Sequence, residues 1–211
     1  MLDFGAPFVN AKTKSMTSGL SPLEIVCLSG RWSARSFTLL LQRGADIMGR
    51  DVEGETCLHH CLSCNWGNGT SSYIHQYSAG IIVLIRYGAD VYAKNIYDRS
   101  ASDMAYADYP DDSTWVGCAR GDVWDFCLAV TNHNVSEFRQ GRSRKAYYGR
   151  RYTRRDFEGL WAGHEHLCPY YYDAEDEPAN SAAPSDDESE EEWVTTDSED
   201  GGSEVIDLEG E

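Results

Sequence analysis

The sequence lacks any long apolar run, and this absence excludes a helical membrane span. Its apolar stretches, such as residues 81–85, are far too short to cross a bilayer, and Met1 is followed by the acidic Asp3 where a leader would be basic and then apolar. A Gly-rich phosphate loop, a nucleophile elbow and a His-Glu-x-x-His helix are also missing. We therefore predict a protein that is not an enzyme, uses no cofactor and binds no membrane.

Basic residues are absent from the C-terminal part of the chain. All 18 lysines and arginines lie at or before Arg155 together with 15 of the 35 acids, so 18 minus 15 gives this part +3. The remainder, residues 156–211, holds the other 20 acids and carries −20. The overall charge of −17 is therefore a property of the tail. The 41% apolar content is enough for a hydrophobic core in the part that precedes it.

The seven cysteines do not form the pattern of a disulfide framework. Their number is odd, and several occupy apolar helical positions, as Cys27, Cys57, Cys61 and Cys127 do, whereas disulfide cysteines of small secreted domains stand at loop ends. This usage favours a reducing compartment. We expect an intracellular protein, nuclear or cytoplasmic.

Two segments end in the same Gly-Ala-Asp turn, and a third is a degraded copy. They are Leu41-Gln-Arg-Gly44-Ala-Asp46, Leu84-Ile-Arg-Tyr-Gly88-Ala-Asp90 and Leu2-Asp-Phe-Gly5-Ala-Pro7, with glycines 39 and 44 residues apart. Apolar residues at helical spacing precede the first two: Phe37, Leu40 and Leu41, and Ile81, Leu84 and Ile85. Glycine after such a run stops a helix because it adopts the left-handed conformation of a C-terminal cap without strain.

A helix start follows each turn. Ser21, Thr56 and Ser100 are of the type that caps free amides at a helix N-terminus. Pro22 stands at the first helical position, and Glu24 three residues after Ser21 completes a capping box. The predicted unit is a cap, a helix, a short connection, an apolar helix, a Gly-Ala-Asp turn and an extended loop to the next cap.

These boxes resemble the ankyrin repeat, whose signature is Thr-Pro-Leu-His at the first helix and a Gly-Ala-Asp turn after the second. Ser21-Pro-Leu-Glu24 and Thr56-Cys-Leu-His59 match the first element, and the turns at Gly44 and Gly88 match the second. The long insertions and acidic tail are loosely similar to fungal members of the family. The resemblance implies an all-α fold, an ankyrin-type helix-turn-helix repeat solenoid, in which His59 hydrogen-bonds between repeats.

The resulting domain organisation has four parts. Residues 1–18 are the end of a partial repeat and its turn, and residues 19–130 are ankyrin-like repeats with a capping helix near 123–130. Residues 131–172 form a basic and aromatic extension, and residues 173–211 a disordered acidic tail. Because the family's period is about 33 residues, we expect an insertion, and residues 65–78 are interpreted as a loop. A start inside a repeat also suggests a truncated remnant of a larger ankyrin protein.

Repeat arrays leave an exposed concave surface, and the resemblance implies that it binds a protein partner while the chain itself is a monomer. The contacts in this family usually come from the turn tips and the first helices. The corresponding partner-binding candidates here are Met48, Arg50, Asp51, Tyr92, Lys94, Asn95 and Tyr97. The alternative is that these residues merely cover the neighbouring repeat.

Five ligand-type residues lie close together in Cys57-Leu-His59-His60-Cys61-Leu-Ser-Cys64. On a helix, Cys57, Cys61 and Cys64 share one face, so a metal-binding or redox protein is an alternative function. The same face carries the core positions of the repeat, where cysteine is a small buried apolar residue. We therefore favour a packing role and predict no metal.

A basic segment with interleaved tyrosines precedes the tail. Its cations are Arg142, Arg144, Lys145, Arg150, Arg151, Arg154 and Arg155. The run resembles a nuclear localisation signal, and it is also compatible with pairing to the acidic tail or with a solvated linker. Nucleic-acid binding ranks lower, because the tail offers competing negative charge.

The acidic tail contains one apolar island, Val205, Ile206, Asp207 and Leu208. With the acids that precede it, this island resembles a SUMO-interacting motif, in which branched residues add a strand to the partner's sheet edge. SUMO is therefore a candidate partner. The alternative is a simple solubilising tail.

Overall fold

The computed structural model describes residues 8–13, 19–30, 32–64, 71–107, 116–140, 142, 148 and 152–172, all within the unit Met1–Glu175. Its helices are α1 (Pro22–Leu28), α2 (Ala34–Gln42), α3 (Cys57–Ser63), α4 (Ser71–Arg86), α5 (Ala101–Ala105), α6 (Val116–Val130), α7 (Val135–Arg139), α8 (Arg154–Trp161) and the 3-10 helix η1 (Glu165–Leu167). Within these residues, one isolated bridge joins Lys94 to Ser100 and no strand forms. The predicted all-α class is confirmed for this part of the chain.

The helices start where the capping residues predict. At α1, Ser21 Oγ accepts the Glu24 N–H at 3.4 Å, and Glu24 Oε2 accepts the Ser21 N–H at 2.6 Å. Ser100 and Asp103 form the same reciprocal box at α5. Such a box satisfies N–H groups that have no partner inside the helix.

The helices before the two predicted turns also end as expected. Gly44 after α2 and Gly88 after α4 have φ angles of +84° and +99°. These angles lie in the left-handed region, where a side chain would add strain. The helix stops predicted at both glycines are therefore confirmed.

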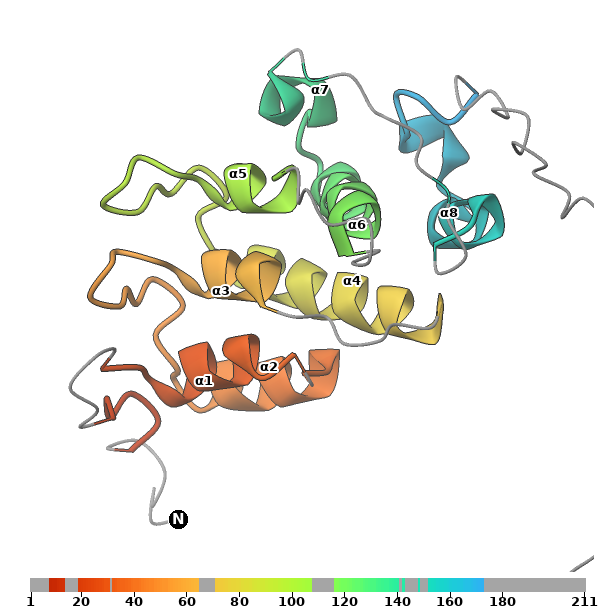
Figure 1. Cartoon of the computed structure of the whole chain (residues 1–211). Helices are drawn as coiled ribbons and strands as arrows, with labels where there is room; N and C mark the ends of the chain where they lie inside the picture. Colours follow the sequence, from red (N-terminus) through yellow and green to blue (C-terminus); the bar gives the residue numbers. More distant parts are fainter. Residues whose placement is uncertain are drawn as a thin grey trace, which may run out of the picture. The chain divides into compact units, whose positions relative to one another are not determined.

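Six of the helices form three pairs that stack on one another (Figure 1). The first helices of the pairs, α1, α3 and α5, contact one another in that order, and so do the second helices, α2, α4 and α6. The loops that connect α2 to α3 and α4 to α5 extend to the same side of the stack (Figure 1). The first and second pairs are therefore each followed by a connecting loop at a common edge.

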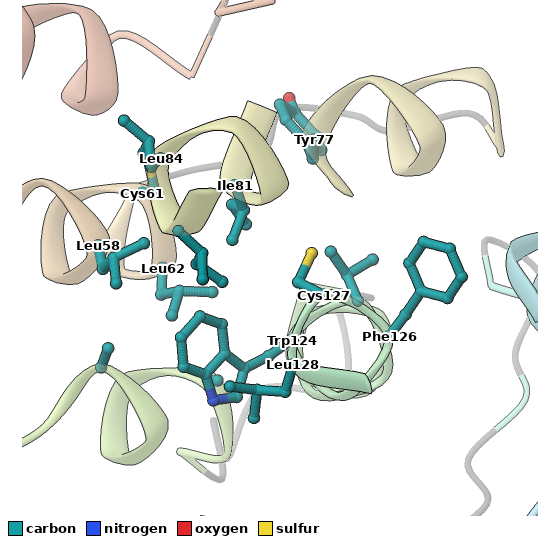
Figure 2. Packing of buried hydrophobic residues seen from close by; sticks show 14 of the residues in the cluster. Leu58, Cys61, Leu62, Tyr77, Ile81, Leu84, Trp124, Phe126, Cys127 and Leu128 are labelled. Carbon is teal, nitrogen blue, oxygen red and sulfur yellow. The ribbon is translucent and has the colours of Figure 1, made fainter. Parts of the chain in front are cut away.

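The core lies between the first helices of the pairs, α1, α3 and α5, and the second helices, α2, α4 and α6. Figure 2 shows Leu58 and Leu62 of α3, Ile81 of α4 and Trp124 of α6 gathered around one apolar volume. All four side chains are fully buried, and the Trp124 indole N–H donates to Ser102 Oγ at 2.9 Å.

No helix in the described part of the chain is long and apolar enough to cross a membrane.

Two element boundaries differ from the sequence-based expectation. Residues 65–78 were expected to be a loop, but α4 begins at Ser71 and carries Ile74 and Tyr77 as buried residues. The apolar spacing of this segment outweighs its Ser, Thr and Asn content. Helix α6 begins at Val116, although the capping helix was expected near 123–130.

The helical unit continues beyond Val130. Helices α7, α8 and η1 all contact α6, so these described parts of the predicted basic and aromatic extension are folded against that helix. Phe126 of α6 meets Trp161 of α8 edge to face, with ring centroids 5.3 Å apart. Trp161 and Phe157 of α8 are buried, which supplies the apolar surface that holds α8 in place.

A buried polar cluster anchors the same region. The Asp125 carboxylate of α6 accepts the Tyr106 hydroxyl at 2.5 Å, the Arg139 Nε–H at 2.9 Å and the Tyr170 hydroxyl. Burial raises the pKa of Asp125 to about 6, although Arg139 and the two hydroxyls oppose this shift. The cluster joins residues from four separate segments, and each depends on the others for a hydrogen-bond partner.

Candidate functional site

The loops that follow α2 and α4 have the same construction at a spacing of 44 residues. Asp46 Oδ1 accepts the backbone N–H two residues later at 2.9 Å, and Asp90 Oδ1 makes the same bond at 2.9 Å. Asp51 Oδ1 accepts the N–H groups two and four residues later, at 2.9 and 2.8 Å, and Asn95 does so at 3.0 Å for both. Side chains thus replace missing backbone partners in both loops.

A series of cations ties each loop to the next. Lys12 Nζ donates to the Arg50 carbonyl at 2.7 Å, and Arg50 Nη1 donates to the Lys94 carbonyl at 2.7 Å and to the Gly54 carbonyl at 2.9 Å. Arg50 and Lys94 are equivalent positions in the two loops. Side chains of one loop therefore fix the position of the next loop.

His59 adds a second connection between the loops. Its Nδ1 accepts the Thr56 N–H at 3.2 Å, which assigns the proton to Nε2, and Nε2 then donates to the Arg99 carbonyl at 2.9 Å. Burial lowers the pKa of His59, so the neutral ring is favoured. The Ile96 N–H also donates to the Glu53 carbonyl at 2.9 Å. The bond expected of His59 between neighbouring units is present.

Three of the seven partner-binding candidates form hydrogen bonds within the loops or are buried there. Arg50 and Asp51 make the hydrogen bonds described above, and Asn95 is buried. Lys94 forms an exposed ion pair with Asp98 at 2.9 Å. The hydrogen bonds of Arg50, Asp51 and Asn95 determine the shape of the loops, while Arg50 and Lys94 remain exposed to solvent.

The other three candidates, Met48, Tyr92 and Tyr97, are more than half exposed. Tyr92 also stacks on Phe138 of α7, with ring centroids 4.9 Å apart. Sequence reasoning missed two further exposed residues, Val52 and Ile96, each 66% exposed at equivalent positions of the two loops. Their shared place in the 44-residue register was the signal that could have found them. We call Met48, Val52, Tyr92, Ile96 and Tyr97 the loop-tip surface.

The cysteines of α3 are packed in the core. Cys57, Cys61 and Cys64 are buried, and the Cys64 thiol donates to the Cys61 carbonyl at 3.1 Å. Burial raises the pKa of Cys57 and of Cys61 well above the ordinary value. Thiolates, which are the form that binds metals or attacks substrates, are therefore disfavoured here.

The basic segment is only partly described. Arg142 pairs with Asp103 at 2.9 Å, and Arg154 pairs with Glu158 at 2.9 Å within α8. Arg155 is exposed on the same helix. The predicted cations Arg144, Lys145, Arg150 and Arg151 lie outside the described residues, as do Val205, Ile206, Asp207 and Leu208 of the tail.

Comparison with protein-family models finds no match, and no curated protein matches the sequence. Function is therefore inferred from the residues of this chain alone. The geometry provides two similar loops, fixed to each other by hydrogen bonds, whose tips expose large apolar side chains. Such an arrangement is suited to contact with another macromolecule.

Proposed function

We propose that this chain is an ankyrin-type repeat protein that binds a partner protein and catalyses no reaction. The repeated capped helix pair, the Gly-Ala-Asp turn and the bond from His59 to Arg99 support the family assignment. Stacked repeats use their regular edge as a binding surface, because each unit contributes an equivalent side chain to it.

The loop-tip surface is the observation that carries this function. Its five members are large and apolar, and each is at least 54% exposed. Exposed apolar groups that cluster on a surface mark interaction sites, and tyrosine is enriched among the residues that dominate binding energy. The hydrogen bonds between the loops fix the backbone that carries these side chains before a partner arrives, which lowers the entropy lost on binding.

Site-specific photo-crosslinking in the native cell tests the proposal. A photoreactive phenylalanine analogue at Tyr97 should capture a defined partner, whereas the same analogue at Tyr73, which is exposed on α4, should not. Replacing Val52 and Ile96 with serine should reduce the yield at Tyr97 at least tenfold. Leu39→Ser on the exposed side of α2 is the matched control and should leave the yield unchanged.

Two results would count against a binding role for this surface. One is the same set of captured proteins at Tyr97 and Tyr73. The other is an undiminished Tyr97 crosslink in the Val52→Ser, Ile96→Ser double variant, provided that its circular dichroism matches the parent. Either result would place the contact elsewhere on the molecule.

We also propose that the tail island binds SUMO by adding a strand to its sheet. The support is the sequence Val205-Ile-Asp-Leu208 with acids on its N-terminal side. Full-length protein should bind immobilised SUMO, and alanine at Val205, Ile206 and Leu208 together should abolish retention. Trp193→Ala with Val194→Ala, in the same acidic tail, is the control. Equal retention of both variants would reject the proposal.

A further inference from the structure

A histidine and two acids converge at the entrance to α3. His60 belongs to α3, and Asp51 and Glu55 stand in the loop that leads into this helix. His60 Nε2 lies 3.4 Å from Asp51 Oδ2, and His60 Nδ1 lies 3.4 Å from Glu55 Oε2. One ligand atom of each residue lies within 4.8 Å of the other two, and within the described residues this is the one such group.

His60 has no conventional hydrogen bond although it is buried. The residue is 2% exposed, and neither ring nitrogen has a hydrogen-bond partner. Buried polar atoms are nearly always paired, and an unpaired one lowers stability. Each ring nitrogen faces a different carboxylate, Nε2 that of Asp51 and Nδ1 that of Glu55, and both acidic side chains are largely buried.

The carboxylates are held so that one oxygen of each remains directed at His60. Asp51 Oδ1 accepts backbone N–H groups of its loop, and Glu55 Oε1 accepts the Asn95 Nδ2–H at 3.3 Å. In metal sites, hydrogen bonds of this kind come from groups outside the ligand shell and orient the ligands toward the ion. In the described part of the chain, no lysine or arginine pairs with either carboxylate, so two acids share one imidazole.

The loop fold does not require this cluster. The next loop has the same hydrogen-bonded shape, yet the positions equivalent to Asp51, Glu55 and His60 hold Asn95, Arg99 and Met104, 44 residues later. A purely structural role would be served equally well by such residues. The donor set is therefore specific to this unit.

We propose that Asp51, Glu55 and His60 bind a divalent transition-metal ion of the zinc class. Zinc bonds to imidazole nitrogen and to carboxylate oxygen are roughly 2.0 to 2.2 Å long, which puts tetrahedral ligand atoms about 3.3 Å apart. The 3.4 Å between His60 Nε2 and Asp51 Oδ2 matches this spacing. The Glu55 oxygen lies 3.4 Å from the other ring nitrogen, and one ligand atom of each of the three residues lies within 4.8 Å of the other two, so Glu55 completes the ligand set by a small movement of its flexible side chain. One ring nitrogen and two oxygens provide three ligands, and water completes the fourth position. The site does not depend on partner binding at the loop-tip surface.

Calorimetry with zinc sulfate on metal-depleted full-length protein tests the site. We expect one equivalent to bind, with at least tenfold weaker binding in Asp51→Asn and in Glu55→Gln and complete loss in His60→Gln. Asp51→Asn keeps the loop intact, because Asn95 shows that asparagine makes the same backbone bonds. Glu53→Gln removes one charge from the same loop without touching the site, and it should bind like the parent.

Cobalt(II) chloride distinguishes this site from the cysteines of α3. Cobalt held by nitrogen and oxygen should show weak visible bands and no intense thiolate charge-transfer band in the near ultraviolet. The proposal is overturned if Asp51→Asn and Glu55→Gln bind zinc as tightly as Glu53→Gln does. It is also overturned if cobalt gives the thiolate band, or if no ion binds and a proton alone bridges His60 to the acids.

Discussion

Replacing Gly80 with alanine should destabilise the protein, although alanine is the better helix former. Gly80 lies inside α4, where its missing side chain allows Trp32 to approach the backbone. An added Cβ would lie 2.5 Å from Trp32 Cδ1 and 2.6 Å from its Nε1. Ordinary carbon contacts are about 3.5 Å or longer. The overlap is therefore close to 1 Å.

Trp32 has little room to move away. It is completely buried, and its ring contacts Phe37 and Tyr77 with centroids 5.9 and 5.0 Å distant. Overpacking of a full core costs about 1 to 3 kcal/mol, and the tight overlap places Gly80→Ala at the upper end. The gain in helix propensity offsets about 1 kcal/mol. The net loss in the free energy of unfolding should be about 2 kcal/mol.

Gly159 of α8 provides the matched control. It is also a helical glycine, but an added Cβ would have no heavy atom closer than His75 Nε2 at 4.0 Å. Gly159→Ala should therefore show the propensity gain alone, roughly 0.5 to 1 kcal/mol of stabilisation. The same chemical change should have opposite signs at the two sites.

Urea denaturation followed by circular dichroism measures both effects. Trp32→Phe should reduce the additional loss caused by Gly80→Ala by more than about 1 kcal/mol, because a smaller ring relieves the overlap. If Gly80→Ala stabilises the protein as much as Gly159→Ala does, the packing of Trp32 against α4 is wrong. Additive losses in the double variant would lead to the same conclusion.

Three further predictions concern the buried cluster and the loops. Arg139→Met should destabilise by about 3 kcal/mol at pH 7.5 in urea melts, because the Asp125 carboxylate would remain buried without its cation. The raised pKa of Asp125, about 6 against 3.8, means that its contribution is full below about pH 4 and lost as pH rises through 6. The difference in unfolding free energy between wild type and Asp125→Asn should therefore shift by about 3 kcal/mol from pH 4 to pH 8, and a flat difference would refute the shift. Arg50→Met should cost about 1 to 2 kcal/mol and speed amide exchange in the loop of Lys94, and unchanged exchange would mean that its two hydrogen bonds are unimportant.

The local elements of the repeats were predictable because their signals are local. Ser21, Glu24 and Pro22 determine the start of α1 through bonds within four residues. Gly44 and Gly88 stop α2 and α4 through their own backbone conformations. Neither the helix start nor the helix stops require a distant residue, so the sequence pattern was sufficient to predict them.

The part beyond α6 was not predictable in the same way. Asp125 and Tyr170 lie 45 residues apart, and neither sequence neighbourhood indicates that they share a hydrogen bond. Phe126 and Trp161 likewise meet only through the fold. A segment that reads as basic and aromatic therefore gave no sign that α8 packs on α6.

The sequence pointed to the loop tips as the candidate surface, and the structure changes which of their side chains are candidates. The loop tips were identified, yet Arg50 and Asn95 turned out to serve the loops themselves, because polar side chains satisfy backbone groups at close range. Val52 and Ile96 were overlooked because neither polarity nor aromaticity marked them. The grouping of His60 with two acids depends on the turn of the chain before α3, which no spacing rule indicated.

The buried thiols give the unmodified protein a set of internal reporters. Of the seven cysteines, the six whose side chains the structure describes are reduced and buried: Cys27, Cys57, Cys61, Cys64, Cys127 and Cys168. They lie in the first, second and third helix pairs and next to η1. An alkylating reagent reaches each of them only when its own layer opens. Mass spectrometry of timed iodoacetamide quenches would therefore rank the layers by opening rate without a single engineered label.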